Sequence, residues 1–375
     1  FDDEVVPHPR GTGAEAAHAA ETLIEVPTEI FVETHLTVEA TRGQLERKLP
    51  RPFWDRLFRW GLLRVFPHRG WLRGAALGAW LWRWTGLQAL FRALGLPQLL
   101  PPRLRALEAL TPPVDLLGAL RGLPESRPPK DIRHRVAVLE GCVQAVFFSG
   151  VNRATAELLS AEGVEVVPVV NQGCCGALEI HAGELEAGRT RARALIDAFE
   201  GVEADAIIVN SAGCGSTLKN YAELFEPEDP YRMRAEALAA RVEDVLEFLA
   251  RLEPRARFRP LEGRAAYHDA CHLAHAQGVR TAPRSVLGRV PGLEIVEVPN
   301  GELCCGSAGI WNVLHPEPAD ALGRRKADDI RSTRVSLLLA ANPGCLLQIR
   351  KHLGADVQTR HPVELLAEQL ERAPL

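Results

Sequence analysis

The eight cysteines of this 375-residue chain form two sets of four with nearly the same spacing. The first two cysteines of each set lie 32 and 33 positions apart, and the last two lie 39 and 40 positions apart. Four thiolates are a donor set suited to zinc or to an iron–sulfur cluster. The pattern therefore predicts two metal sites, with every cysteine as a ligand. The first set is Cys142, Cys174, Cys175 and Cys214, and the second set is Cys271, Cys304, Cys305 and Cys345.

The segments that carry these cysteines are also repeated. "RVAVLEGCVQ" at 135–144 matches "RAAYHDACHL" at 264–273, and "VEVVPVVNQGCCG" at 164–176 matches "LEIVEVPNGELCCG" at 293–306. "IIVNSAGCG" at 207–215 matches "LLAANPGCL" at 338–346, and the closing "VEDVLEFLARL" matches "VELLAEQLERA". Randomly placed cysteines would not duplicate their spacing, so the second part of the chain is a duplicated folding unit.

Short β-branched runs alternate with amphipathic segments after residue 130, which predicts parallel sheets in an α/β fold. We predict two duplicated parallel-sheet lobes related by pseudo-twofold symmetry, residues 130–255 and 256–375. The predicted strands are Val136–Leu139, Val164–Val170, Ala206–Val209, Ala265–Tyr267, Leu293–Val298 and Ser336–Ala340. The predicted helices are Ala154–Glu162, Glu184–Phe199, Thr217–Leu224, Arg234–Leu252, Arg284–Val290, Pro318–Ile330 and Cys345–His352.

Each cysteine segment follows a predicted strand and precedes a predicted helix. Because the carboxyl ends of parallel strands meet at one edge of a sheet, we expect each set to converge on its own pocket. The neighbouring glycines allow positive φ angles and close backbone approach. Helix N-termini at the same edge would lower the pKa of the thiols. These glycines are Gly141, Gly173, Gly176, Gly213, Gly306 and Gly344.

Three other interpretations of the cysteines remain open. Buried structural cysteines are common, but they would not explain two sets of four. A zinc site with four sulfurs is possible, although the usual CxxC pair is absent. Disulfides are disfavoured because neighbouring cysteines bridge each other only with strain. An iron–sulfur cluster is the favoured interpretation.

Three histidines lie beside the second set, at His268, His272 and His275. His272 and His275 could share one helix face. The first repeat has no histidine in the matching segment, so chemistry shared by both sites does not need one. A histidine here could instead move protons or contact a substrate anion.

The N-terminal part has a different composition. Residues 1–44 are polar and predicted to be only partly ordered, and residues 45–120 are predicted to form a helical arm rich in Arg and Trp. Between Arg51 and Arg105 lie ten arginines and one acidic residue, together with six of the seven tryptophans. The arm could wrap the main body with its arginine stems, or it could present a surface to a membrane or a partner protein. A spanning helix is not expected, because Arg83 interrupts the best apolar window.

The overall composition excludes several classes of function. A net charge of −4 argues against a nucleic-acid-binding protein. The chain has no GxGxxG after a strand, no Walker loop, no GxSxG and no HExxH, so neither a dinucleotide site nor a hydrolytic site is predicted. The N-terminus shows no secretory signal. We expect a cytoplasmic protein, with peripheral attachment to the inner membrane as a further option.

The cysteine segments carry a resemblance to a known family. "LEGCVQ", "GCCGAL", "YHDACHLAHAQ", "CCGSAG" and "NPGC" resemble the cysteine-rich CCG domains of glycolate oxidase iron–sulfur subunits. Residues 130–370 are also similar to lactate-utilisation protein A, the anaerobic glycerol-3-phosphate dehydrogenase C subunit and the heterodisulfide reductase B subunit. The Arg/Trp-rich segment resembles the middle region of the glycolate oxidase subunit.

This resemblance implies an electron-transfer function. In the family, FAD-bearing partner subunits oxidise glycolate or another 2-hydroxy acid, and electrons pass through iron–sulfur centres, 4Fe-4S in type, toward a membrane quinone. All eight cysteines would be ligands. The alternatives are a lactate-utilisation or heterodisulfide-reductase-like subunit that acts at the cluster, and a zinc-stabilised assembly module without a redox function.

The sequence departs from this family pattern in two ways. Relatives of the heterodisulfide reductase type end their motif in CxxC, but Ser211 and Asn342 stand where its first cysteine would be. Four candidate ligands therefore remain in each lobe. The ferredoxin-like CxxCxxCxxxCP motifs of many family members do not occur in this sequence.

Overall fold

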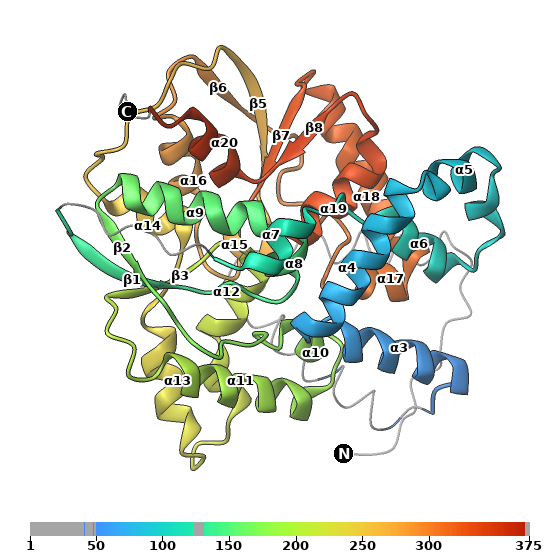
Figure 1. The fold of residues 1–375 in the computed structure, drawn as a ribbon, viewed down its shortest axis with the longest axis horizontal. Helices are drawn as coiled ribbons and strands as arrows, with labels where there is room; N and C mark the ends of the chain where they lie inside the picture. The colour runs from blue at the N-terminus through green and yellow to red at the C-terminus, as the bar shows by residue number, and fades with distance from the viewer. Residues whose placement is uncertain (1–40, 42–47, 49, 124–130, 372–375) are drawn as a thin grey trace.

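The computed structural model describes residues 41, 48, 50–123 and 131–371 and contains two four-stranded sheets (Figure 1). The sheet orders are β2-β1-β3-β4 and β6-β5-β7-β8, and every pairing is parallel. The predicted pair of parallel-sheet lobes is confirmed. The strands of the first lobe are β1 (His134–Val138), β2 (Val164–Val167), β3 (Ala206–Val209) and β4 (Val242–Asp244). The strands of the second lobe are β5 (Gly263–His268), β6 (Leu293–Glu297), β7 (Leu337–Ala340) and β8 (Gln358–Arg360).

Helices cover both faces of each sheet, and the central strands are correspondingly apolar and buried. All four residues of β3 are buried, as expected for a parallel strand covered on both faces. The helical elements of the first lobe are α8 (Val143–Phe147), α9 (Ser149–Ala161), α10 (Ala177–His181), α11 (Leu185–Phe199), α12 (Ala212–Lys219), η2 (Tyr221–Leu224), α13 (Tyr231–Ala239) and α14 (Val245–Arg251). Those of the second lobe are α15 (Cys271–Ala274), α16 (Thr281–Leu287), α17 (Trp311–Leu314), α18 (Pro316–Ser332), α19 (Pro343–Leu353) and α20 (Pro362–Gln369).

Three predicted elements are wrong in detail. The single helix predicted at Arg234–Leu252 is interrupted by β4, because Val242–Asp244 pair with β3 and Asp244 then caps α14. The strand predicted at Val164–Val170 ends at Val167, since Pro168 has no N–H to donate to a ladder. The helix predicted at Thr217–Leu224 starts earlier, in α12, and its last turn is the separate 3-10 helix η2.

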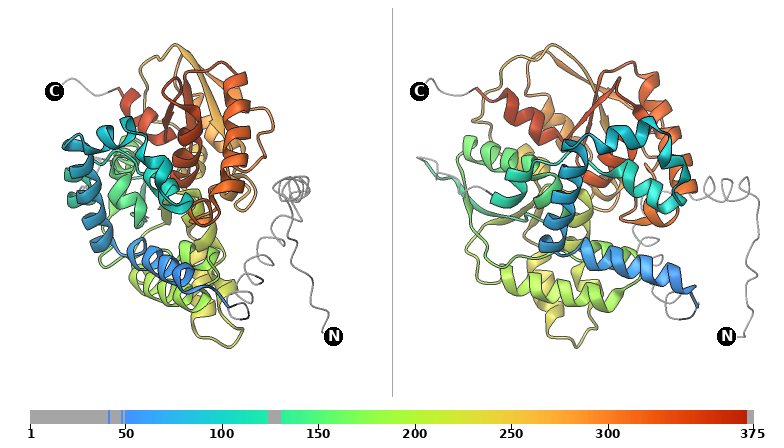
Figure 2. Two further views of the ribbon diagram at one scale, coloured as in Figure 1. Left: turned by 90° about the vertical axis from the view of Figure 1, so that its right-hand side faces the viewer. Right: turned by 45° about the vertical axis from the view of Figure 1, so that its right-hand side comes forward.

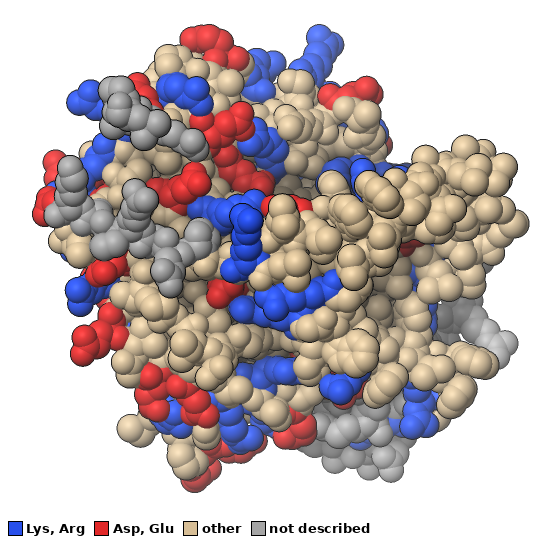
Figure 3. Space-filling model, viewed as in Figure 1, with Lys and Arg blue, Asp and Glu red and all other residues tan. Residues whose placement is uncertain are grey.

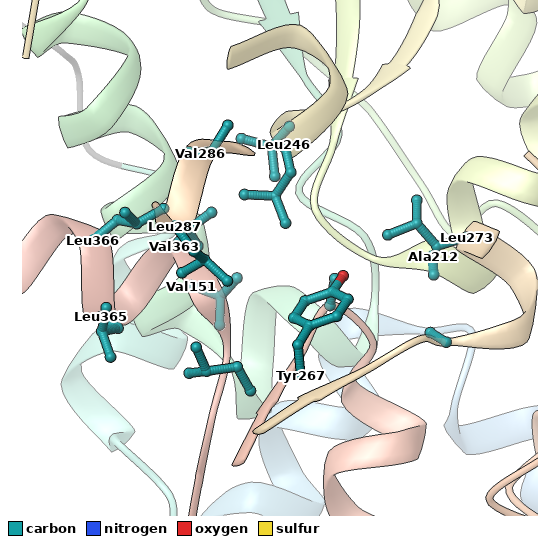
Figure 4. Packing of buried hydrophobic residues seen from close by; sticks show 14 of the residues in the cluster. Val151, Ala212, Leu246, Tyr267, Leu273, Val286, Leu287, Val363, Leu365 and Leu366 are labelled. Atoms are coloured by element: carbon teal, nitrogen blue, oxygen red, sulfur yellow. The ribbon is translucent and has the colours of Figure 1, made fainter. Parts of the chain in front are cut away.

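The two lobes exchange their closing helices. Helix α20 of the second lobe packs on α9 of the first, and α14 of the first lobe packs on α16 of the second. Figure 4 shows side chains from these helices meeting Tyr267 of β5 in one buried cluster. The core is therefore continuous across the predicted lobe boundary at residues 255 and 256, and each lobe completes the other.

The exchanged helices begin with equivalent capping boxes. Asp244 caps α14 with Glu247, and His361 caps α20 with Glu364. The His361 side chain accepts a hydrogen bond of 3.3 Å from the N–H of Val363. Complete burial lowers the pKa of His361 to about 3, so its ring stays neutral in the folded protein.

Acidification should destabilise the fold through His361. The unfolded chain takes up this proton near pH 6.5, whereas the folded chain resists it down to about pH 3. Stability is therefore fully present above pH 6.5 and lost as the pH falls, by about 2 kcal/mol between pH 6.5 and 5. We expect His361→Asn, which keeps a capping acceptor, to weaken this pH dependence in urea unfolding at pH 5 and 7. Equal pH dependence in the variant would contradict the assignment.

A helical arm precedes the lobes, as predicted, and Figure 2 shows it along one side of both. Helix α4 packs on α8 of the first lobe, and α6 packs on α17, α18 and α19 of the second. The predicted segment 1–44 lies outside the described residues, apart from residue 41. Within the described ranges, no helix is long and apolar enough to cross a membrane. The arm comprises α3 (Phe53–Val65), α4 (Arg69–Trp84), α5 (Leu87–Ala93), η1 (Leu96–Leu99), α6 (Pro102–Leu110) and α7 (Leu116–Arg121).

The outer face of the arm is unusually apolar. Leu77, Leu81 and Trp84 follow one stripe of α4, and each is at least 42% exposed. A second stripe starts on α5 with Leu87 and Leu90, which are 49% and 56% exposed. Figure 3 shows a largely uncharged surface over α5 and α6. Apolar stripes normally face a core, so two exposed stripes on adjoining helices are unusual for a protein surface.

Candidate metal centre

The first cysteine set lies at the carboxyl ends of three neighbouring strands. Cys142 follows β1 and caps α8, Cys174 and Cys175 lie between β2 and α10, and Cys214 lies in the first turn of α12 after β3. Because β1 connects to β2 on one side and lies beside β3 on the other, this is where an open α/β sheet forms its ligand crevice. The first cysteine set therefore lies at the carboxyl edge of the first sheet, as the sequence predicts.

The thiols of the first set contact one another in a row. The Cys142 and Cys174 sulfurs are 3.1 Å apart. Cys175 forms hydrogen bonds with both Cys174 and Cys214. All are buried except Cys214, which is partly exposed, and all eight cysteines of the chain are free thiols.

The second set repeats this row. Cys304 forms hydrogen bonds with Cys271 and Cys305. The Cys305 and Cys345 sulfurs are 3.1 Å apart. The order of neighbours along the row is repeated, but the 3.1 Å pair is Cys142–Cys174 in the first lobe and Cys305–Cys345, the counterpart of Cys175–Cys214, in the second. The described structure brings together the four cysteines of each predicted set.

The CCG glycines shape both cysteine loops. Gly176 and Gly306 have φ angles of 79° and 83°, and their N–H groups lie 3.5 Å from Cys174 Sγ and 3.3 Å from Cys304 Sγ. A side chain at either position would be strained, as the sequence predicts. Gly141 also has positive φ, but Gly173, Gly213 and Gly344 do not. For Gly344 the requirement is space, because a Cβ there would lie 2.5 Å from Ser307 Oγ.

The local environment separates the pKa values of the thiols. Hydrogen bonds from Cys142 and Cys175 hold the pKa of Cys174 well below its usual range, although burial opposes this. In the second lobe, the hydrogen bond to Cys305, helped by His268 and Asn342, lowers the pKa of Cys345 to about 5. The neighbouring thiols and burial raise the pKa values of Cys142, Cys175, Cys271 and Cys305 well above the usual range. Each row therefore mixes thiolate-favouring and thiol-favouring positions, and a bound cation or cationic cluster would favour the thiolate form of all four.

Both sets line one cavity of about 220 Å³, whereas the sequence predicts two separate pockets. That prediction is wrong because the two sheets bring their carboxyl ends together. The N–H of Ala212 donates to the Ala341 carbonyl at 3.1 Å, and the N–H of Gly213 lies 3.3 Å from Asn342 Oδ1. The N-termini of α12 and α19 thus meet across the lobe interface.

The arm closes part of this cavity with apolar side chains. Phe66, Leu107 and Leu110 line it beside the cysteines. Arg69 of α4 donates to the Gly141 carbonyl at 2.9 Å, next to Cys142. The arm therefore contributes to the site as well as to the outer surface.

The three predicted histidines have different positions. His268 is buried at the end of β5, near Cys305 and Cys345. His272 lines the cavity, and its ring centroid lies 5.1 Å from that of His181 in the other lobe. His275 follows the last residue of the four-residue α15 and contacts Arg280 at 2.8 Å. His272 thus lies inside α15 and His275 is its C-cap residue, so the idea that they share a helix face stays a prediction.

Sequence reasoning missed two buried charged groups near the thiols. Glu179 of α10 pairs with Arg191 at 3.2 Å, and burial, reinforced by nearby Cys174, raises its pKa to about 7. Lys326 of α18 is fully buried and donates to the Asn300 carbonyl at 2.6 Å, in the loop that leads to Cys304. Lys326 stands in the polar segment "GRRKADDI", which predicts an exposed helix face, so no local signal indicates its burial.

The donor chemistry of both rows fits a thiolate-bound inorganic group. Each row offers four free thiols, two of them at 3.1 Å, next to an N–H of a glycine. Lys326 and Arg191 place positive charge behind the rows. Iron–sulfur clusters bind to such thiolate sets, and hydrogen bonds to their sulfurs are usual.

Comparisons with known proteins agree with this chemistry. A family model described as a cysteine-rich domain, CCG, matches residues 136–219 and 265–350, and a second, the linker region of the glycolate oxidase iron–sulfur subunit, matches residues 54–111. The chain is 35% identical to a probable glycolate oxidase iron–sulfur subunit of Bacillus subtilis, over 81% of this chain and 70% of that protein.

Two further relatives span much of the same region. The glycolate oxidase iron–sulfur subunit of Escherichia coli is 32% identical, over 91% of this chain and 78% of that protein. Lactate utilization protein A of an Exiguobacterium species is 31% identical, over 64% of this chain and 99% of that protein. The match to the lactate utilization protein therefore leaves about a third of this chain uncovered.

Proposed function

From the fact that this chain belongs to the family of glycolate oxidase iron–sulfur subunits, we propose that it carries electrons inside a glycolate oxidase complex. The observation that supports this most is the meeting of two matching rows of four thiols at one cavity. An iron–sulfur cluster bound there supplies one-electron transfer. Four cysteines in each lobe suit a four-iron cluster, and a zinc-only structural site would not need two such rows in contact with a cavity.

The residues of this chain hold and insulate the clusters. All eight cysteines are the proposed ligands, from Cys142 to Cys345. Five of them are buried, whereas Cys214, Cys271 and Cys304 are partly exposed. The N–H groups of Gly176 and Gly306 stabilise negative sulfur. Oxidation of glycolate at carbon belongs to an FAD-bearing partner subunit, because this chain has no dinucleotide fingerprint and the cavity is mainly lined by thiols and apolar side chains.

We place the electron acceptor, a membrane quinone, on the side of the arm. The cavity reaches Phe66 and Leu107 of the arm, and the outer arm surface carries exposed stripes on α4 and α5. Of the ten arginines between Arg51 and Arg105, Arg59 is buried, and Arg69 and Arg103 donate to lobe carbonyls. The exposed ones suit anionic lipid headgroups, and they are Arg56, Arg64, Arg83, Arg92 and Arg105. We therefore propose that the arm attaches this chain to the membrane surface and that the two lobes lie in the cytoplasm.

The proposed electron transfer can be tested by reducing the clusters of this chain with glycolate through the flavin subunit. When the full chain is mixed anaerobically with its flavin subunit, glycolate should bleach the visible absorbance of this chain within the turnover time of the complex. Lactate, supplied in a parallel experiment, tests the lactate-utilisation alternative that the third relative suggests. Bleaching by lactate alone, or no bleaching by either acid, would overturn the proposal.

Changing the exposed stripes should weaken binding to membranes. We expect Leu81→Ser with Leu90→Ser to reduce binding to phosphatidylglycerol vesicles at least about tenfold, because each side chain loses about 2 kcal/mol of apolar burial. Met233→Ser on α13 is the matched control, since Met233 is 77% exposed but lies outside the arm. Vesicle flotation measures the effect. Unchanged flotation, with loss of the flavin subunit from the complex instead, would assign the stripes to a protein partner.

A further inference from the structure

The two rows of thiols have different neighbours. His268 ends β5, and the sequence repeat places Leu139 at the same position of the first lobe. Asn342 precedes α19, and its first-lobe counterpart is the shorter Ser211. The duplication has therefore kept the cysteines and changed the residues behind them.

His268 is positioned to reach the second row. Its side chain is 1% exposed, and its ligand atom and the sulfurs of Cys305 and Cys345 lie within 4.8 Å of one another. Nδ1 of His268 has no hydrogen-bond partner among the described residues. The geometry therefore directs this ring at the thiol site.

A second polar group approaches the same sulfur. Asn342 Nδ2 lies 3.4 Å from Cys345 Sγ. In the first lobe, the residue that matches His268 is the fully buried, apolar Leu139. Cys345 thus has an imidazole and an amide as neighbours, where Cys214 has an aliphatic side chain and a hydroxyl residue at the matching positions.

We propose that His268 is part of the donor environment of the second site and makes the group bound by Cys271, Cys304, Cys305 and Cys345 easier to reduce than the first-lobe group. Hydrogen bonds to cluster sulfurs, or imidazole in place of thiolate, both raise the reduction potential of an iron–sulfur centre. The two sites then differ in potential, and electrons collect on the second. This inference rests on the proposed iron–sulfur function.

The test exchanges the two residues between lobes. In the full chain with Cys175→Ser, which is expected to leave only the second site loaded, His268→Leu should lower the ratio of reduced to oxidised site at a fixed solution potential at least about tenfold, about 59 mV for one electron. Redox titration followed by EPR measures this shift. In the reciprocal Cys305→Ser chain, Leu139→His should raise the potential of the first site.

A second readout does not depend on activity. With 15N-labelled histidine, pulsed EPR of the reduced second site should contain a nitrogen coupling that His268→Leu removes. If the leucine variant misfolds and loses iron, His268→Asn, which keeps a hydrogen-bond donor, replaces it in the experiment. Its reduction potential should lie between those of the unmodified site and the leucine variant. An unchanged potential and unchanged nitrogen couplings in a variant that keeps its iron would overturn the inference. Absence of iron from the unmodified chain would instead overturn the proposed function.

Discussion

Replacing Cys175 or Cys305 with serine is expected to remove about half of the bound iron, in each case from one lobe. Each of these cysteines contacts two neighbouring thiols, so it is central to its row. A serine hydroxyl is a poor ligand for iron compared with a thiolate, which is the species that binds. Iron and acid-labile sulfide per chain, measured after anaerobic purification, give the loss. The double variant should contain neither.

The two single variants also show whether each lobe binds its own inorganic group or both rows share a single one. Since both rows line one cavity, a single shared group is a physical alternative. It predicts that either variant loses all of the iron. Such a result would contradict the assignment of one group to each lobe, and full iron content in both variants would contradict the ligand assignment itself. Gly173→Ala, next to the first pair of cysteines in open space, is the control for general damage to the loop.

Gly306→Ala is expected to have the second largest effect. The residue has a φ of 83°, and an added Cβ would lie 2.6 Å from the Ala319 carbonyl oxygen. Strain at positive φ costs about 1–3 kcal/mol, and the clash with backbone adds to it. The loop must shift, which moves the N–H of Gly306 away from Cys304 Sγ. We expect lower stability in urea unfolding and loss of iron from the second lobe alone.

The control for this variant is the neighbouring loop of the first lobe. Gly173 has no atom within 4 Å of the position of its Cβ and does not have positive φ, so Gly173→Ala should change neither stability nor iron content. Gly176→Ala, where φ is 79°, should resemble Gly306→Ala but affect the first lobe. Equal tolerance at Gly173 and Gly306 would show that the turn does not control the site.

The sequence is sufficient to predict the parts of the fold that repeat. The strand Ala206–Val209 is predicted with its observed bounds because an apolar run is followed at once by polar residues. The two sets of cysteines can be found because their spacing is duplicated, and the strand-to-helix position of each one places it at a sheet edge. These are local signals, and the fold preserves them.

The remaining features depend on how the lobes meet. Three-residue strands such as β4 carry no periodicity, so Val242–Asp244 are absorbed into a predicted helix. The exchange of α14 and α20 arises from pairing between lobes, and no local pattern encodes it. For the same reason the sequence predicts two pockets, whereas contact between Ala212 and Ala341 merges them into one cavity.

Metal and sulfide analysis of the unmodified full chain tests the thiol assignment most directly. After anaerobic purification, we predict iron and acid-labile sulfide in equal amounts, about eight of each per chain if both rows hold a four-iron cluster, with broad visible absorbance that reductant bleaches. A colourless protein that contains zinc without sulfide would contradict the claim that these eight cysteines bind redox-active clusters.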